Sequence, residues 1–137
     1  MPNKTSVGYN ADGRVQDQSY VPDDAIHYPP IPGAVYLNIV PGPENAMPVY
    51  PEQLLSKKLS AVLVQAKAIV NTSGNVESVE ILDGDWYDPA FRDATIKAVR
   101  AWHFTPLRRV VGGKTELLPT TEHFIFVFSQ VNGKAWA

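Results

Sequence analysis

The pattern of hydrophobic and polar positions becomes regular after residue 50 and predicts a β-hairpin. Within residues 61–70, valine or alanine occupies every second position, which is typical of a strand with one buried and one largely solvated face. Residues 76–82 alternate in a similar way. Between these strands lies Asn71-Thr72-Ser73-Gly74-Asn75, where Gly74 can take a positive φ without strain. The two strands are therefore expected to pair directly.

Helical patterns lie on both sides of this hairpin. Pro51 suits the first turn of a helix, and residues 52–60 place three leucines on one side. Asp88-Pro89 is a typical helix start, with the aspartate as N-cap. Residues 89–101 are therefore expected to form a helix that buries an apolar stripe. The side chains of that stripe are Phe91, Ala94, Thr95, Ala98 and Trp102.

The last regular pattern is a strand at residues 121–129, in which three phenylalanines share one face. The order helix–strand–strand–helix–strand predicts an α+β domain with a three-stranded antiparallel sheet packed on one or two helices. The side chains expected in its core are Val62, Val64, Ala68, Phe91, Ala98, Trp102, Phe104, Phe124 and Phe126.

The N-terminal third of the chain lacks this regularity. Residues 1–20 are polar and offer too few apolar side chains to offset the entropy of ordering them. Prolines within residues 22–33 exclude a helix and favour polyproline II. Residues 34–40 are apolar and predict a short strand or a segment that lies on the core. The expected organisation is a mobile polar and proline-rich arm at 1–47, a domain at 48–130 and a tail at 131–137.

Composition narrows the classes of function. The chain has 137 residues, of which 45% are hydrophobic and 19% charged, as expected for one globular domain. A net charge of -2 gives no electrostatic reason to expect nucleic acid or a membrane surface as partner. No cysteine is present, which excludes disulfides and thiolate metal sites. No stretch approaches the length of a spanning helix, so any membrane attachment would need an N-terminal anchor outside these residues.

Catalytic and cofactor motifs are absent from the sequence. The histidines His27, His103 and His123 lack metal-ligand spacing. No nucleophile elbow, phosphate loop or dinucleotide fingerprint occurs. Asp83-Gly84-Asp85 is only superficially similar to a calcium loop, because the closing glutamate is missing. We therefore expect no enzymatic activity, no cofactor, no metal and no small-molecule substrate.

Several motifs occur in a combination that resembles the C-terminal domain of TonB-type energy transducers. The resemblance extends from Pro48 to Ser129 and includes the hairpin and the helix at 89–101. Its sequence motifs are Pro48-x-Tyr50-Pro51, Trp102-x-Phe104-x-Pro106 and Phe124-x-Phe126-x-Phe128. It implies a non-catalytic periplasmic domain that contacts an outer-membrane transporter during energy-coupled uptake.

The resemblance also implies a mode of binding. An extended motif at the N-terminus of the transporter would add as a strand to the domain's sheet, which needs an edge with unpaired backbone donors and acceptors. The strand at 121–129 is the expected edge. Tyr50 is a further candidate contact, although a tyrosine packed against the sheet fits the same pattern. The residues expected to bind the partner are Tyr50, Thr121, His123, Ile125 and Val127.

Two binding functions stay open at this point. The first is TonB-like binding of an outer-membrane TonB-dependent receptor or another periplasmic protein. The second is a free-standing adaptor, inhibitor or immunity-type protein of the same fold, in which residues 1–47 carry the specific contacts. The basic residues Arg108, Arg109 and Lys114 are a weaker candidate, either as a solvated turn or as a contact for an acidic partner.

Overall fold

The computed structural model describes residues 4–9, 14–20, 28, 31–83 and 86–132. The helices of this part are α1 (Glu52–Leu55) and α2 (Pro89–Arg100). Its strands are β1 (Lys4–Tyr9), β2 (Arg14–Tyr20), β3 (Val35–Leu37), β4 (Val40–Pro41), β5 (Val62–Val70), β6 (Val76–Ile81), β7 (Phe104–Thr105), β8 (Leu107–Val111), β9 (Lys114–Leu118) and β10 (Thr120–Ser129). Most of the expected polyproline segment, part of the Asp83-Gly84-Asp85 loop and most of the tail lie outside the described residues.

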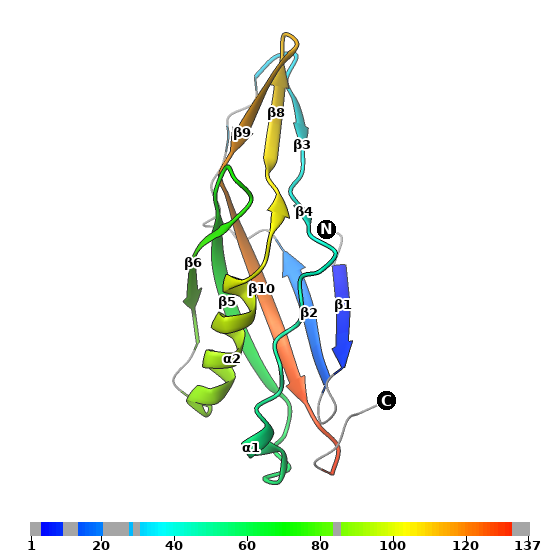
Figure 1. The fold of residues 1–137 in the computed structure, drawn as a ribbon, viewed down its shortest axis with the longest axis vertical. Coiled ribbons are helices and arrows are strands. Elements are labelled where there is room, and N and C mark those ends of the chain that lie inside the picture. The colour runs from blue at the N-terminus through cyan, green and yellow to red at the C-terminus, as the bar shows by residue number, and fades with distance from the viewer. Residues whose placement is uncertain (1–3, 10–13, 21–27, 29–30, 84–85, 133–137) are drawn as a thin grey trace.

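The main sheet is antiparallel and has, in the described residues, the order β1-β2-β10-β5-β6. β5 and β6 form the expected hairpin, and β10 pairs with β5 from Thr120 opposite Val70 to Phe128 opposite Val62. The helix α2 and the segment from β4 to α1 lie over one face of this sheet (Figure 1). The fold is α+β, as predicted, and the helix α2 follows the hairpin as predicted.

The N-terminal residues differ from the expected mobile arm. β1 and β2 pair with each other, and β2 pairs with β10 from Tyr20 opposite His123 to Arg14 opposite Ser129. β10 is therefore the central strand of the sheet, and the prediction of three strands was wrong in number. Strand pairing is made by backbone hydrogen bonds, so a polar segment can join a sheet without the apolar alternation that identifies strands in a sequence.

A second sheet extends away from the helices at one end of the molecule (Figure 1). In the described residues its order is β3-β8-β9, with Val35 opposite Val110 and Leu107 opposite Leu118. β4 and β7 pair separately. Of the two alternatives for residues 34–40, the structure has the strand, because this run supplies β3 and the first residue of β4.

The hydrophobic core lies between the main sheet and α2. β5 buries every second residue from Val62 to Val70, and the three phenylalanines of β10 are buried. Eight of the nine side chains expected in the core are buried, and Ala98 is only half-buried. On α2, Val99 is buried in place of Ala98, since residues four apart share a helix face and Val99 follows Phe91 and Thr95 at that spacing.

Trp102 connects three parts of the fold. Its ring centroid lies 5.2 Å from that of Phe124 and 5.8 Å from that of Phe126, both edge-to-face. Its indole Nε1 donates a hydrogen bond to the carbonyl oxygen of Ala46 at 2.7 Å. The end of α2 is thereby attached to β10 and to the extended segment that precedes α1.

The loop between β5 and β6 approaches the Trp-x-Phe segment closely. Gly74 has a φ of 82°, and its carbonyl oxygen accepts a hydrogen bond from the N–H of Phe104 at 2.8 Å. A Cβ at this position would lie 1.9 Å from the carbonyl oxygen of Phe104. Glycine is therefore required here both for its conformation and for the approach of the two chains.

Replacing Trp102 with alanine is expected to lower the free energy of unfolding by about 3–5 kcal/mol, through lost burial and the cavity left behind. Trp102→Phe keeps most of the apolar volume but leaves the Ala46 carbonyl without its donor, so a loss of about 1–3 kcal/mol is expected. Urea titration measures both. A Trp102→Ala loss below about 1 kcal/mol would contradict the role given to this residue.

Replacing Gly74 with alanine is expected to cost about 3–5 kcal/mol, because strain at positive φ adds to the contact with Phe104. Gly113→Ala is the matched control, since Gly113 has a φ of 77° and nothing within 4 Å of an added Cβ. That control should cost only about 1–2 kcal/mol. Equal losses in thermal or urea unfolding would mean that the contact with Phe104 is unimportant.

Candidate protein-binding site

The predicted binding residues centre on β10, whose two edges are both paired in the structure. Successive backbone N–H groups of a strand point to opposite edges. From His123 to Phe128 one edge pairs with β5 and the other with β2. The expectation that this edge is unpaired is therefore corrected, because β2 uses the backbone groups that a partner strand would need.

Four of the five predicted binding residues share one face of β10, opposite the phenylalanines. Thr121 and His123 are buried, whereas Ile125 and Val127 are half-buried. His123 was expected to point outward, and its burial is a second correction. Thr121 lies opposite Ile69 of β5 and beyond the pairs that β10 makes with β2. The part of this face nearest to solvent is therefore the pair Ile125 and Val127.

Tyr50 is separate from these residues and belongs to the core. Its ring centroid lies 5.5 Å from that of Phe91 and 6.2 Å from that of Phe128, and only 2% of its surface is exposed. Its hydroxyl has no hydrogen-bond partner among the described residues. Burial raises the pKa of Tyr50 above its ordinary value of 10.0. The structure thus places Tyr50 as a packed tyrosine and not as an exposed contact.

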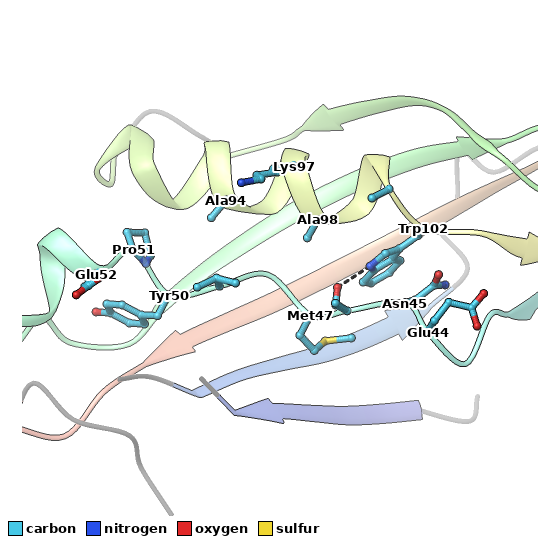
Figure 2. A pocket seen from close by; sticks show the side chains of 13 residues that line it. Glu44, Asn45, Met47, Tyr50, Pro51, Glu52, Ala94, Lys97, Ala98 and Trp102 are labelled. Atoms are coloured by element: carbon cyan, nitrogen blue, oxygen red, sulfur yellow. Dashed lines mark hydrogen bonds between the residues drawn. The ribbon is translucent and has the colours of Figure 1, made fainter. Parts of the chain in front are cut away.

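A groove of about 470 Å³ lies between residues 44–52 and α2 (Figure 2). The segment alternates, with Pro48 and Tyr50 buried and Val49 62% exposed. The residues that line the groove are mostly apolar, and they include Met47, Val49, Ala94, Ala98 and Trp102, with Lys97 beside them. Such a lining can accept apolar side chains, and its charged residues are Glu44, Glu52 and Lys97.

The sequence interpretation missed this groove because it assigned Ala94 and Ala98 to the buried stripe of α2. Phe91, Thr95 and Val99 also repeat every four residues, and their side chains are larger than those of the alanines. This repeat was the sequence signal for the face of α2 that is buried. The alanines then lie at the margin of the buried face, where their small size leaves room beside residues 44–52.

Arg109, one of the basic residues near the turn between β8 and β9, is engaged within its own sheet. Arg109 donates to the two carboxylate oxygens of Glu116 on β9 at 3.0 and 3.1 Å. Hydrogen bonds to Tyr36 and Glu116 raise the pKa of Arg109 further. Arg109 therefore joins β3, β8 and β9, which favours a structural role over contact with an acidic partner.

Clusters that could hold a metal ion and helices that could span a membrane are both absent from the part of the chain that the structure describes. Among the described residues, no group of three or more histidine, aspartate or glutamate side chains is placed to hold a metal ion. His103 contacts Asn75, with Nδ1 3.0 Å from Oδ1, and His27 lies outside the described residues. No helix in these ranges has the length and apolar character needed to cross a membrane.

Comparison with known families gives one match. Residues 46–124, more than half of the chain, match the family model of the Gram-negative bacterial TonB protein C-terminal. The chain belongs to the TonB C-terminal family. The resemblance inferred from the sequence motifs is thus confirmed. Searches of curated proteins and of solved structures found no match.

The matched span places the family's common part within the structure. It begins at Ala46, whose carbonyl accepts from Trp102, and ends at Phe124 inside β10. It includes most of the residues that line the groove, but neither β1 nor β2. Domains of the TonB C-terminal family are periplasmic, bind proteins and are not enzymes.

The buried hydroxyl of Tyr50 predicts a dependence of stability on pH. Because the pKa is raised in the folded state, the folded chain favours the protonated phenol. Its contribution to stability is therefore complete below the ordinary value of 10.0 and is lost as the pH rises above it. Tyr50→Phe should remove this part of the alkaline loss, and should leave stability near pH 8 unchanged or higher. Urea titrations at about pH 8 and about pH 11 measure both effects. Identical alkaline losses in the two proteins would contradict the assignment.

Proposed function

We propose that the chain is a periplasmic protein-binding domain that acts as the C-terminal domain of TonB does. Its partner is the extended N-terminal motif of an outer-membrane TonB-dependent receptor, which adds as a strand to the main sheet during energy-coupled uptake. Membership of the TonB C-terminal family supports a protein partner. Catalysis has no part in the proposal, and no nucleic acid or small-molecule substrate is expected.

The observation that carries the proposal is the pairing of the β10 edge with an extended segment. From His123 to Ser129, this edge is shaped to accept an antiparallel strand, because β2 already occupies it over seven residue pairs. Backbone hydrogen bonds would fix the direction and position of the added strand largely independently of the partner's sequence. The half-buried side chains of Ile125 and Val127 would select the register, since alternate residues of an added strand lie on their face.

One observation favours a second candidate function. Residues that precede the matched span supply β1, β2, β3 and β4, and two of these strands pair with β10 and β8. A free-standing adaptor, inhibitor or immunity-type protein of the TonB fold could present these strands to another protein. Chemical cross-linking separates the two functions, because a partner of the second kind would be linked to β1–β4 while β2 stays paired with β10.

Strand addition is tested with a synthetic peptide that spans the N-terminal motif of an outer-membrane TonB-dependent receptor of the same bacterium. Alternate N–H groups of an added strand point toward β10 and away from it. Two versions of the peptide, N-methylated on one or the other alternate set, are therefore matched controls for each other. Calorimetry should show that the parent peptide and one methylated version bind, and that the other version does not. Equal binding of both methylated versions would contradict backbone pairing as the mode of recognition.

A further inference from the structure

The edge of β10 that faces away from β5 can pair with one strand at a time. The N–H and C=O groups of residues 123–129 that point away from β5 are directed toward β2, whose residues 14–20 lie opposite. A backbone N–H makes one strong hydrogen bond, and neighbouring strands lie about 4.8 Å apart. A partner strand and β2 therefore cannot occupy this edge together.

The β1–β2 hairpin is attached to the rest of the sheet along a single ladder. Among the described residues, β1 pairs with β2 alone, and β2 joins the hairpin to β10. The sequence of β2, RVQDQSY, contains one aliphatic residue. Isolated two-stranded hairpins are marginally stable in water, and polar strands contribute little hydrophobic stabilisation. The attachment therefore depends mostly on backbone hydrogen bonds, which a partner strand can replace one for one.

The position of the hairpin in the chain separates it from the binding domain itself. Both strands lie outside residues 46–124, which match the TonB C-terminal family. The match ends at Phe124, so it includes β5, α2 and residues 120–124 of β10, the strand whose other edge pairs with β5. The hairpin is thus an additional element placed on the edge that the proposed function requires.

We infer that the β1–β2 hairpin is an intramolecular competitor of the partner, and that an extended partner segment binds only by displacing β2 from β10. This inference rests on the proposed function. The apparent affinity equals the affinity of the open edge multiplied by the fraction of molecules in which the edge is open. If the edge is open in about one molecule in ten, binding is therefore about tenfold weaker. A first event that releases the hairpin would raise the affinity by the same factor.

A pair of cysteine variants tests the displacement in the full chain, which has no cysteine of its own. Gln16 lies opposite Val127 of β10 on one side and opposite Val7 of β1 on the other. Q16C with V127C fastens the hairpin to β10, whereas V7C with Q16C fastens the two strands of the hairpin to each other. Mass spectrometry verifies that each disulfide has formed. The receptor peptide should bind the first variant only after reduction, and should bind the second equally in both states.

A second pair of variants measures the competition without a cross-link. D17P with Q18P removes two successive donors of β2, one of which points to β10 and the other to β1. D17A with Q18A is the matched control that keeps both donors. The proline variant should bind the receptor peptide about tenfold more tightly or better, and the alanine variant should bind like the wild-type chain.

The outcomes distinguish this inference from the proposed function. Binding to the oxidised Q16C/V127C chain with unchanged affinity would overturn the inference, while peptide recognition itself would stand at another place. Absence of binding in every form, the proline variant included, would overturn the proposed function and the inference with it. Amide exchange gives an independent measure. On binding, protection should be lost in β2 and retained in β10, and protection retained in both strands would contradict displacement.

Discussion

Each backbone group of β10 can pair with one neighbouring strand, and the rest of the structure depends on how its two edges are shared. The edge paired with β5 holds the part of the sheet that covers the core. The other edge holds β2 and is the place where we propose that the partner strand binds. The same strand directs Phe124, Phe126 and Phe128 toward α2. Core packing and strand pairing therefore use different directions on β10, since side chains point above and below the sheet while the hydrogen bonds between strands lie within it.

The Trp-x-Phe-x-Pro motif explains why the rest of the domain is held in one arrangement relative to β10. Trp102 packs on the phenylalanines of β10 and donates to Ala46. His103 contacts Asn75, and Phe104 donates to Gly74. Three successive residues thus fix the segment before α1, the sheet and the β5–β6 loop. The groove beside α2 follows from the first of these attachments, because residues 44–52 are held alongside the helix without filling the space next to its alanines.

The elements that could be predicted from the sequence are those whose burial leaves a periodic pattern. β5, β6, α2 and β10 each show apolar residues at the spacing of their secondary structure, and most of the core followed from them. β1 and β2 leave no such pattern, because their pairing is made by the backbone. The strand that carries the proposed binding residues could be recognised for the same reason that the core could, because β10 alternates between buried and less buried side chains. The occupation of its edge and the burial of His123 depend on contacts between distant parts of the chain, which no local pattern records.

Occupation of the edge by β2 lowers the affinity of every partner strand, and it thereby limits which partners bind at a given concentration. A strand that binds through its backbone alone replaces the hydrogen bonds of β2 without a net gain, so the exchange is close to neutral. A partner must therefore gain its advantage from side chains, and Ile125 and Val127 are the half-buried contacts available on the outer face of β10. An open edge would accept many extended segments, because backbone pairing is nearly independent of sequence. An edge that already holds a strand of its own chain lowers the apparent affinity of every partner by the same factor, so the ratio between the affinities of two partners is unchanged. At a given concentration, however, only those segments whose side chains add to the pairing still bind to a large fraction of the molecules.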